Sequence, residues 1–552
     1  MTSADSAVLR ILERRGMTAS GDIEEFLSDR PKRTHDPFLL RNMEEGVEFI
    51  LSAARRGRRI CVYGDYDVDG ITAAAALVQA LSLIAADVGW YIPSRFDEGY
   101  GLNREALKSI ADAGWQTVVT VDCGSVSPDE VAYGRSIGLD IMVTDHHNAK
   151  GREADCIIIN PKQEGDSYPF DELSGCGVVF KLLQAMQRKG LLPKSLLSDV
   201  LDLVGIATIA DIVPLVDENR TITKYGLRAV GSTRRPGLRR LLERTGLADK
   251  EIGTRAVAYS IAPHINAAGR MGEAHEVVEL LLTHDTGRIE SITETLVAQN
   301  ARRRTIQAEA LDFCVGIVEG KGRRSGLGDA PFYVIDAGDA HEGITGIVAG
   351  KLREVYGRPV IILTKSQGRD GRPCLKGTGR SIPGVDIYAM LERHVAAFEK
   401  FGGHSMACGF LMHAEYEDEL RAGLIAEMEA IMASNPGAMD QTRAPDIALD
   451  LSDITPGLVS ELDRMAPFGR GNPQPLIELS RMKVAKLFFM GEKQQHLKIV
   501  SENLDIVVFG NAAAYSPGLR KGVEVSALGY PSVAVWKGRE RVQFIAEAVK
   551  AI

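Results

Sequence analysis

The chain has 552 residues, 45% of them apolar and 25% charged, which fits a folded globular protein of three or four domains and excludes a disordered or collagen-like chain. A formal net charge of −9 argues against a protein that coats nucleic acid over its whole surface, but it does not exclude a nuclease with a local basic groove. Seven scattered cysteines without a Cys-x-x-Cys pair argue against a disulfide framework and a thiolate zinc site, and they fit a reducing cytosol.

The N-terminal part of the chain predicts a parallel α/β sheet. A helical lead-in over residues 1–55 precedes a series of short apolar runs that alternate with helical stretches. The runs lie at residues 59–63, 117–121, 141–144 and 156–159. Each run ends in polar residues, and ligands of doubly wound sheets bind at the carboxyl ends of the strands. We therefore expect a catalytic domain over residues 56–225.

No segment of the sequence has the features of a membrane-spanning helix or a signal peptide. The most apolar run, residues 71–86, is too short to span a bilayer and contains Gln79 and Ser82, so we expect a buried helix there. The first ten residues lack the basic-then-apolar pattern of a signal peptide. A cytoplasmic location is the expectation.

The remainder of the chain predicts three further parts. Residues 226–320 are mostly helical, with one long helix over 293–319, and connect to a second α/β domain over 330–438. Residues 445–552 contain short alternating strands that suit a small β-barrel of the kind that binds single-stranded nucleic acid. The strands are expected at 483–488, 496–500, 505–509, 523–528 and 542–546. Trp536 and Phe544 could stack on bases, although core packing explains them as well.

The sharpest motif is the acidic loop Gly64-Asp-Tyr-Asp-Val-Asp-Gly70, which follows the first apolar run. Its carboxylates, Asp65, Asp67 and Asp69, alternate along the chain and repel one another, so a divalent cation is the simplest partner. A solvated acidic turn or a lone calcium loop is the alternative on this motif alone. The EF-hand pattern fails because its terminal glutamate is missing.

Polar residues at other element ends complete a candidate metal site. Asp122 follows the second run, His146 and His147 follow Asp145 after the third, and Asp211 lies in an apolar stretch. Alone, Asp122 could be a helix cap and Asp211 a paired core acid. Together, carboxylates with one or two imidazoles favour two Mn²⁺ or Mg²⁺ ions over zinc and suit phosphodiester hydrolysis.

At this point the sequence resembles the DHH phosphoesterases. Their four motifs are similar to Asp67-x-Asp69-Gly70, Asp122, Asp145-His146-His147 and Asp211. A larger set of segments resembles one branch of the family, the 5′→3′ single-strand DNA exonucleases. These segments lie at residues 35–40, 91–95, 98–102, 159–162, 168–170, 266–270, 356–359, 379–383, 402–404, 467–469 and 471–473. The resemblance runs from about residue 35 to the C-terminus.

The resemblance implies a fold and a role for each matching residue. The expected fold is a DHH-type doubly wound parallel sheet, a long helix, a DHHA1-type α/β domain that binds substrate, and a C-terminal OB-like barrel. The two metals would be held by Asp67, Asp69, Asp122, His146 and Asp211. Asp122 would bridge them, Asp65 would be a further ligand or orient one, and His147 would contact the scissile phosphate.

A second set of residues is implied to bind the DNA backbone. The phosphate-binding residues would be Arg95, Arg270, Thr378, Arg380 and Ser381, and the cleft-lining residues Gly402, Gly403 and His404. Arg380, between Gly379 and Ser381, has a fair phosphate-binding context by itself, although a turn arginine in water is its alternative. The two glycines could equally form a plain turn, and His404 could be a structural histidine.

The resemblance thus implies a metal-dependent exonuclease on single-stranded DNA that acts in DNA repair and recombination, as a monomer. It also implies two partners, a RecQ-type helicase and a single-strand binding protein. One alternative is a DHH phosphodiesterase for short oligonucleotides or cyclic dinucleotides, whose chains are typically shorter and lack the barrel. Another is a non-catalytic scaffold, which the complete ligand set disfavours.

Overall fold

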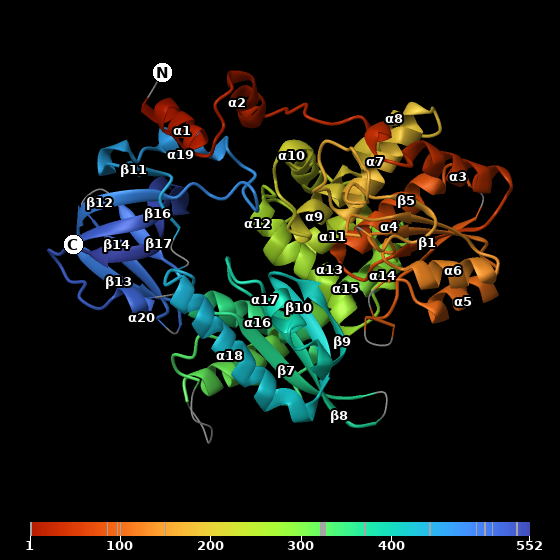
Figure 1. The fold of residues 1–552 in the computed structure, drawn as a ribbon. Helices are drawn as coiled ribbons and strands as arrows, with labels where there is room; N and C mark the ends of the chain where they lie inside the picture. Colours follow the sequence, from red (N-terminus) through yellow and green to blue (C-terminus); the bar gives the residue numbers. More distant parts are fainter. Residues whose placement is uncertain are drawn as a thin grey trace. The chain divides into compact units, whose positions relative to one another are not determined.

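The computed structural model describes residues 3–85, 87–95, 98–99, 101–149, 151–320, 327–368, 371–440, 443–492, 494–501, 504–510, 512–536 and 539–552. The chain forms two compact units, drawn in Figure 1. The first comprises Met1–Asn266, Ala274–Thr293 and Ala444–Ile552, and the second comprises Ala267–Glu273 and Glu294–Arg443. Most of the linker expected at residues 320–329 lies outside the described residues. Among the described residues, no helix has the length and apolar character needed to cross a membrane.

The first unit contains the predicted parallel sheet. Its five strands run in the order β2-β1-β3-β4-β5, and every neighbouring pair is parallel. Their bounds are β1 Ile60–Gly64, β2 Val88–Tyr91, β3 Thr117–Val121, β4 Asp140–Thr144 and β5 Ile157–Ile159. The strand β2 was not predicted, because it is a short, half-buried edge strand without a long apolar run. The doubly wound fold is confirmed.

Helices cover both faces of this sheet. On one face, α5 (Arg104–Asp112) and α6 (Pro128–Ser136) pack against apolar side chains of the strands. On the other face lie α3 (Met43–Arg55), α4 (Val68–Leu81) and α7 (Gly175–Arg188). The alanine-rich α4 is almost wholly buried, as the sequence predicts for this apolar run. It begins three residues earlier than expected, at the acidic loop, and ends at Leu81, before the expected end at residue 86.

A helical region follows α7, as predicted. Its members in the first unit include α8 (Lys194–Asp199), α9 (Leu201–Ala210), α10 (Asp217–Gly231), α11 (Pro236–Arg244) and α14 (His275–Leu282). Gly205 of α9 and Gly226 of α10 let these two helices touch, because a Cβ at Gly205 would lie 2.6 Å from the Cα of Gly226. The long helix α15 runs from Thr286 to Val318 and so begins seven residues before the predicted start.

A buried ion pair joins α7 to α10. Lys181 is fully buried, and its Nζ lies 3.0 Å from Oε2 of Glu218. The same ammonium donates to the backbone oxygen of His35 (2.8 Å), and the Tyr168 hydroxyl donates to the other Glu218 oxygen (2.5 Å). Burial lowers the pKa of Lys181, and the charge of Glu218 opposes that change. Buried charges are tolerated only when they are paired in this way.

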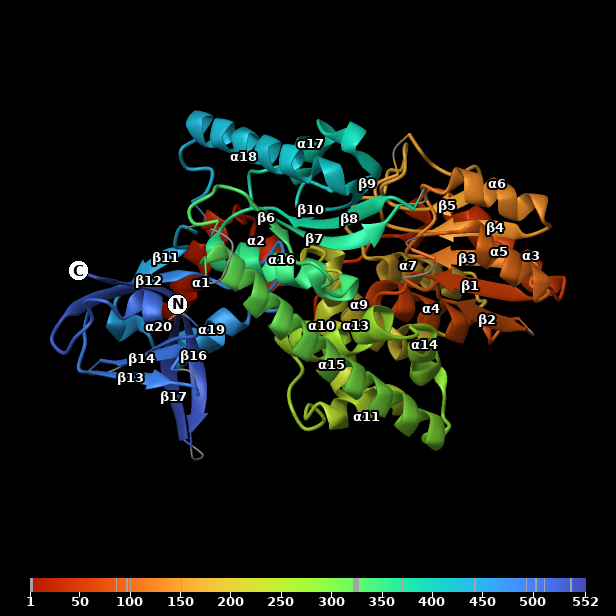
Figure 2. The same cartoon turned by 90° about the horizontal axis from the view of Figure 1, so that it is seen from below.

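The second unit is a mixed sheet between two helical layers (Figure 2). Its order is β6-β7-β8-β10-β9, and only β6 and β7 are parallel. The strands are β6 Tyr333–Asp336, β7 Val360–Gln367, β8 Pro373–Arg380, β9 Phe398–His404 and β10 Ala407–His413. One face packs on α16 (Glu342–Tyr356) and α15, the other on α17 (Ile387–Glu392) and α18 (Glu417–Ser434).

The C-terminal part of the first unit is a seven-stranded sheet in the order β11-β12-β16-β17-β15-β14-β13. Its strands are β11 Ile447–Leu449, β12 Ile477–Lys483, β13 Lys486–Met490, β14 His496–Val500, β15 Asp505–Val508, β16 Glu524–Trp536 and β17 Arg539–Ala551. The strand predicted at residues 483–488 is displaced, because the chain turns after β12 and β13 begins only at Lys486. The strands β11 and β12 were not predicted. The predicted pattern of short strands otherwise holds, with β16 and β17 longer than expected.

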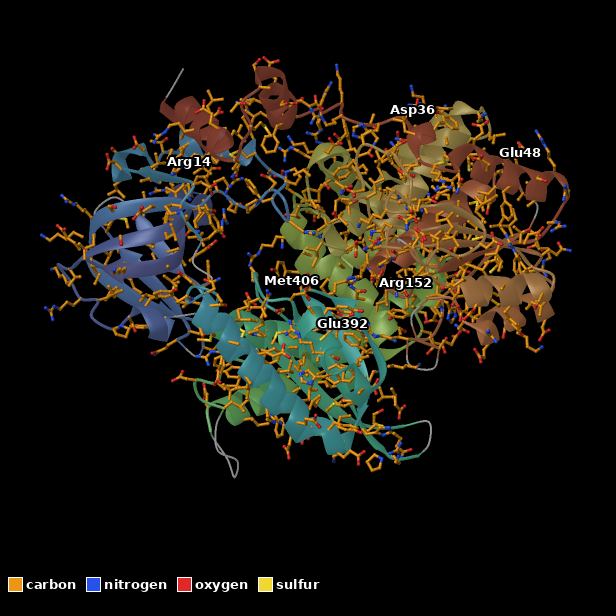
Figure 3. The ribbon with its side chains drawn as sticks, in the orientation of Figure 1. Arg14, Asp36, Glu48, Arg152, Glu392 and Met406 are labelled. Carbon is orange, nitrogen blue, oxygen red and sulfur yellow. The ribbon has the colours of Figure 1, made fainter. Side chains whose placement is uncertain are left out.

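The N-terminal helix α1 (Ser3–Arg14) completes the core of this C-terminal sheet. Its buried residues Ala7, Val8, Ile11 and Leu12 belong to the same apolar cluster as Phe544 and the inner faces of the strands. Figure 1 shows α1 beside α19 (Pro456–Asp463) and β11. Arg14, labelled in Figure 3, donates to the backbone oxygen of Asp446 (2.8 Å), and the Arg15 Nε–Asp446 Oδ1 distance is 2.9 Å.

Candidate metal centre

The acidic loop turns sharply between β1 and α4. Asp67 caps α4, because its Oδ1 accepts hydrogen bonds from the backbone of Asp69 (2.9 Å) and Gly70 (3.3 Å). Gly70 is required here, since a Cβ at this position would lie 2.5 Å from the backbone nitrogen and oxygen of Asp65. The cap and the glycine together hold Asp65, Asp67 and Asp69 in one compact turn at the carboxyl end of β1.

Two further elements place carboxylates at the same edge of the sheet. Asp122 follows β3 with φ of +62°, a left-handed conformation that aspartate tolerates better than most residues. Gly175 at the start of α7 leaves room for it, because a Cβ there would lie 2.6 Å from Asp122 Oδ1. The Asp69 carboxylate accepts backbone hydrogen bonds from Gly175 (2.6 Å) and Cys176 (2.8 Å), so the first turn of α7 fixes its orientation.

His146 lies at the middle of these carboxylates. Its Nε2 is 3.1 Å from Oδ1 of Asp122, 3.8 Å from Oδ2 of Asp69 and 3.7 Å from Oδ2 of Asp211. Asp211 is the C-terminal cap of α9, so the fourth predicted motif reaches the site as expected. The ligand atoms of Asp65, Asp67 and Asp122 form one group within 4.8 Å of one another, and those of Asp69, His146 and Asp211 form a second.

Asp145 makes hydrogen bonds beside the acidic cluster and is not among its grouped ligand atoms. Its Oδ1 accepts hydrogen bonds from the backbone of His146 (2.7 Å) and from Nδ1 of His147 (2.8 Å), and its Oδ2 accepts from the backbone of Ser125 (3.0 Å). These bonds saturate the carboxylate, which orients the His147 ring instead. The one clue to this role in the sequence is that Asp145 directly precedes the pair His146 and His147.

The electrostatics of the cluster fit divalent cations. Burial and the charge of Asp67 raise the pKa of Asp65, and burial and the charge of Asp69 raise the pKa of Asp122. Buried oxygen atoms of both carboxyls, and both ring nitrogens of His146, have no hydrogen-bond partner within the described residues. Burial also lowers the pKa of His146 to about 3, so its ring is neutral and able to ligate. Oxygen-rich ligands with one imidazole suit Mn²⁺ or Mg²⁺.

Stabilisation by Mn²⁺ should therefore increase with pH. Burial and the charge of Asp67 raise the pKa of Asp69 to about 7, and burial and the charge of Asp69 raise that of Asp211 to about 8. Both titrate near 4 in an unfolded chain, so the metal-free fold binds extra protons and loses stability as pH rises toward 8. We expect Mn²⁺ to raise the melting temperature more at pH 8 than at pH 6, measured by scanning calorimetry. Equal shifts at both pH values would contradict this.

The predicted phosphate-binding residues fall in both units. Arg95 belongs to the first unit, where its guanidinium lies 5.1 Å from the centre of the Tyr66 ring and its charge acts on Asp65. Residue 100, in the matching segment 98–102, lies outside the described residues. Arg95 is thus the one predicted DNA-binding arginine that stands beside the carboxylates within the same unit.

In the second unit, three predicted residues converge on the first turns of α16. The Arg270 guanidinium donates to the backbone oxygen of Gly343 (2.7 Å), and the hydroxyls of Thr378 and Thr345 are 3.1 Å apart. The Arg380 guanidinium lies against Gly346, where a Cβ would be 3.0 Å from its Nη2. The amino-terminal end of a 15-residue helix with two arginines beside it is a ready site for a phosphate.

The remaining predicted residues occupy the ends of β8 and β9. Ser381 is 1% exposed and its hydroxyl donates to the backbone oxygen of Val385 (2.6 Å), so it braces the turn after β8. Gly402, Gly403 and His404 are exposed at the end of β9, beside a turn marked by Met406 in Figure 3. Gly403 has φ of +147°, and a Cβ there would lie 2.4 Å from the Ala407 oxygen, so this position requires glycine.

The C-terminal sheet exposes aromatic residues that the sequence reasoning missed. Phe544 is fully buried in the core, and the Trp536 side chain lies outside the described residues. Phe488 on β13 is 49% exposed, and Phe509 after β15 is 59% exposed. The strand register places Phe488 opposite Lys498, on the face that also carries His496, whose ring meets that of Phe509 at 5.4 Å. With β13 placed correctly, the alternation of inward and outward side chains along a strand would have indicated Phe488 as an exposed aromatic residue.

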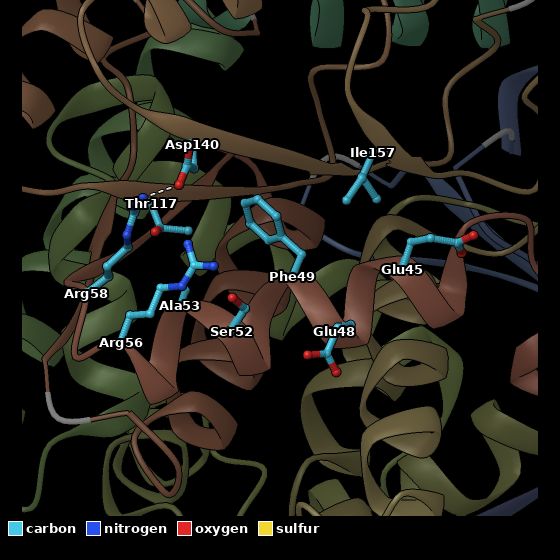
Figure 4. Close-up of a pocket in the computed structure, with 10 residues that line it drawn as sticks. All are labelled: Glu45, Glu48, Phe49, Ser52, Ala53, Arg56, Arg58, Thr117, Asp140 and Ile157. Atoms are coloured by element: carbon cyan, nitrogen blue, oxygen red, sulfur yellow. Dashed lines mark hydrogen bonds and ion pairs between the residues drawn. The ribbon is translucent and has the colours of Figure 1, made fainter.

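A separate hollow lies at the opposite edge of the parallel sheet (Figure 4). It is lined by the helix α3 and by Thr117, Asp140 and Ile157, each of which is the first residue of its strand. Arg58 reaches toward Asp140 there, in an ion pair. The hollow therefore belongs to the amino ends of the strands, whereas the acidic cluster occupies the carboxyl ends, where ligands of such sheets bind.

Comparison with known families divides the chain into three matching regions. Residues 59–208 match the DHH family, N-terminal domain, residues 329–432 match the DHHA1 domain, and residues 445–548 match the RecJ OB domain. All of the residues of the acidic cluster except Asp211 fall in the first region. Arg380 and the β9 glycines fall in the second, and the exposed aromatics in the third.

Individual relatives extend the similarity over nearly the whole chain. The single-stranded-DNA-specific exonuclease RecJ of Bacillus subtilis is 33% identical over 98% of this chain and 67% of its own length. That of Escherichia coli is 31% identical over 92% of this chain and 90% of its own. The crystal structure of RecJ in complex with Mn²⁺ from Thermus thermophilus superimposes with a TM-score of 0.81 at 29% identity, covering 99% of this chain and 75% of that one. The same protein is also known in complex with Mg²⁺.

Proposed function

This chain belongs to the RecJ family of single-stranded-DNA-specific exonucleases, and from that membership we propose that it releases nucleotides from the 5′ end of single-stranded DNA. It is a phosphodiester hydrolase of the DHH type. The observation that carries the proposal is the complete acidic cluster: five carboxylates and a neutral imidazole meet at the carboxyl ends of the strands. A role in DNA repair and recombination fits this activity.

The residues of the acidic cluster would hold two ions of Mn²⁺ or Mg²⁺. The ligands would be Asp65, Asp67, Asp69, Asp122, His146 and Asp211. Asp122 would serve both ions; in support of this, it belongs to one ligand group and lies 3.1 Å from the histidine of the other. When bound, such ions acidify a water molecule and withdraw charge from the phosphodiester that it attacks.

His147 is the residue that we assign to the scissile phosphate. Its side chain is 34% exposed, whereas that of His146 is 7% exposed, so only His147 is open to a substrate. Burial opposes a charge on its ring, but the hydrogen bond to Asp145 and the charges of Asp145, Asp211 and Asp65 together raise the pKa of His147 to about 9. Because Nδ1 is engaged with Asp145, Nε2 is the ring atom that would donate to a phosphate oxygen and stabilise its charge.

The DNA backbone would be held by basic groups in each unit. We assign Arg95 to phosphates near the acidic cluster, and Arg270, Thr378 and Arg380 to a phosphate at the start of α16. The exposed backbone of Gly402, Gly403 and His404 would contact the same DNA strand. Ser381 would support Arg380 by holding the turn that follows it. We also propose that the chain has five parts, at residues 1–55, 56–225, 226–320, 330–438 and 445–552.

A pair of end-labelled oligonucleotides tests the activity and its direction. Incubated with the protein and Mn²⁺, a single strand labelled at the 5′ end should release labelled mononucleotide from the first time point. The same strand labelled at the 3′ end should shorten gradually and release its label last. Release of the 3′ label first would overturn the direction but keep the chemistry. Cleavage of a dinucleotide without cleavage of long strands would favour the short-oligonucleotide phosphodiesterase instead.

The aromatic face of the C-terminal sheet would hold the strand away from the site of cleavage. Stacking of a base on an aromatic ring contributes about 1–3 kcal/mol by alanine substitution, so Phe488→Ala should weaken binding of a long single strand by roughly 5–150-fold. Phe489→Ala is the matched control, because Phe489 is 48% exposed on the same strand but lies on the opposite face. Fluorescence anisotropy with a labelled oligonucleotide measures both; an equal loss in the two variants would refute the assignment.

The cell biology of the chain follows from the same proposal. We propose a RecQ-type helicase and a single-strand binding protein as partners, because an exonuclease restricted to single strands needs duplex opened and strands kept accessible. A monomer in the cytoplasm is the expected state. Co-purification with each partner, and light scattering of the purified chain, test these two statements.

A further inference from the structure

A second cluster of metal-ligating side chains lies in the second unit. Cys374 on β8, Glu399 on β9 and His413 on β10 come from three adjacent strands at one end of the sheet. Cys374 and His413 are direct cross-strand partners, and the register shift of β10 next to Met412 lies beside them. The Cys374 sulfur is 3.5 Å from Oε1 of Glu399 and 3.5 Å from Nδ1 of His413.

We propose that these three side chains form a zinc site, separate from the acidic cluster. Tetrahedral zinc with a sulfur ligand at about 2.3 Å and nitrogen or oxygen ligands at about 2.0–2.2 Å places neighbouring ligand atoms about 3.5 Å apart. Both sulfur distances match that edge. One thiolate, one imidazole and one carboxylate suit Zn²⁺, whereas the oxygen-rich acidic cluster suits Mn²⁺ or Mg²⁺.

The surroundings leave the site accessible from one side. Cys374 is buried, but the side chains of His413 and Glu399 are 17% and 21% exposed, so an ion can enter and a water molecule can take the fourth position. The Nε2 of His413 lies 3.5 Å from Glu399 Oε1 and 3.2 Å from Nη2 of Arg372. If zinc binds Nδ1, the ring proton stays on Nε2. That N–H cannot accept a hydrogen bond from the exposed Arg372 guanidinium, which must turn away, whereas Glu399 can stay in place.

The position of the site points to a structural role. Glu399 is near the start of β9, the edge strand of the sheet, and the exposed glycines Gly402 and Gly403 are at the other end of that strand. In the described sheet β9 pairs with one strand, β10, and its Phe398 and Phe401 pack against the core. A metal that ties β9 to β8 and β10 would fix the edge strand, and with it the hairpin that carries those glycines.

Cobalt substitution tests the site without any reference to catalysis. Co²⁺ bound through a thiolate shows a sulfur-to-metal charge-transfer absorption, which oxygen and nitrogen ligands do not give. We expect this band when Co²⁺ is added to the full chain, and its loss in Cys374→Ser. Cys408→Ser is the matched control, because Cys408 is another buried cysteine of the same sheet and should leave the band unchanged.

Zinc titration of a second variant keeps the proposal falsifiable if Cys374→Ser does not fold. His413→Gln alters a partly exposed side chain, so this variant should fold. Losing a residue that only supports a metal ligand typically lowers affinity by roughly 10–100-fold, and calorimetry should find a larger loss of zinc affinity here. With the acidic cluster saturated by Mn²⁺, added zinc should raise the melting temperature of the wild type more than that of His413→Gln. A wild type without the cobalt band, or a band that persists in folded Cys374→Ser, would overturn the site and mean that the three groups form only weak hydrogen bonds.

Discussion

Asp122→Asn should lower the rate of nucleotide release by about 1000-fold or more while leaving the protein folded. Asp122 links the two ligand groups of the acidic cluster, so its charge is needed by both metals. Losing the several kcal/mol of transition-state stabilisation that such ions provide corresponds to this factor. Asparagine retains the shape of the side chain and tolerates the left-handed backbone at φ of +62°, which alanine would strain.

The measurement is initial release of a 5′ label in Mn²⁺ by equal amounts of folded wild type and variant. Asp140→Asn is the matched control, because Asp140 is an exposed carboxylate at the other end of β4, paired with Arg58. The control should retain nearly full activity. In the absence of metal, Asp122→Asn should melt no lower than the wild type, since it removes a buried, mutually repelling acid. Activity within tenfold of wild type would show that Asp122 is not a ligand.

Lys181→Met should lower the free energy of unfolding by about 3–5 kcal/mol. The substitution leaves Glu218 buried and charged with no cation beside it, because the Lys181 ammonium lies 3.0 Å from the carboxylate and both side chains are almost fully buried. The pair also anchors the segment before α3, since the ammonium donates to the His35 oxygen.

Urea denaturation followed by circular dichroism measures this loss. Lys189→Met is the matched control: Lys189 directly follows α7 and its ion pair with Glu44 is exposed, so its removal should cost at most about 1 kcal/mol. Adding Glu218→Gln to Lys181→Met should recover part of the loss, because the unpaired charge is removed. Equal destabilisation by the two lysine substitutions would show that the buried Lys181–Glu218 pair contributes no more to stability than an exposed ion pair.

Most of the metal centre could be predicted from the sequence because its residues follow strands. The strands β1, β3 and β4 are runs of β-branched and apolar residues that end in Asp65, Asp122 and Asp145, and parallel strands bring such ends together. The role of Asp145 could not be predicted, because a carboxylate beside a histidine can bind a metal or the ring, and only the hydrogen bonds distinguish them.

Other features depend on contacts that sequence patterns do not carry. The edge strand β2 is four residues long and half-buried, too short for a clear alternation. Phe488 is exposed and Phe544 is buried, and strand pairing, which the sequence does not show, decides which face of the sheet each side chain occupies. The cluster of Cys374, Glu399 and His413 has no motif spacing, since its members come together only through the pairing of β8, β9 and β10.

The shared core of α1 and the C-terminal sheet has a consequence for synthesis of the protein in the cell. Arg15 and its partner Asp446 are separated by 431 residues, so ribosomes adding roughly 5–20 residues per second produce the second about 20–90 seconds after the first. Throughout that interval Ala7, Val8, Ile11 and Leu12 lack most of their native surface, because apart from residues 17–27 their cluster belongs to the C-terminal part of the chain. The nascent N-terminal helix is therefore an exposed apolar segment that chaperones can bind, and its docking is among the last events of folding.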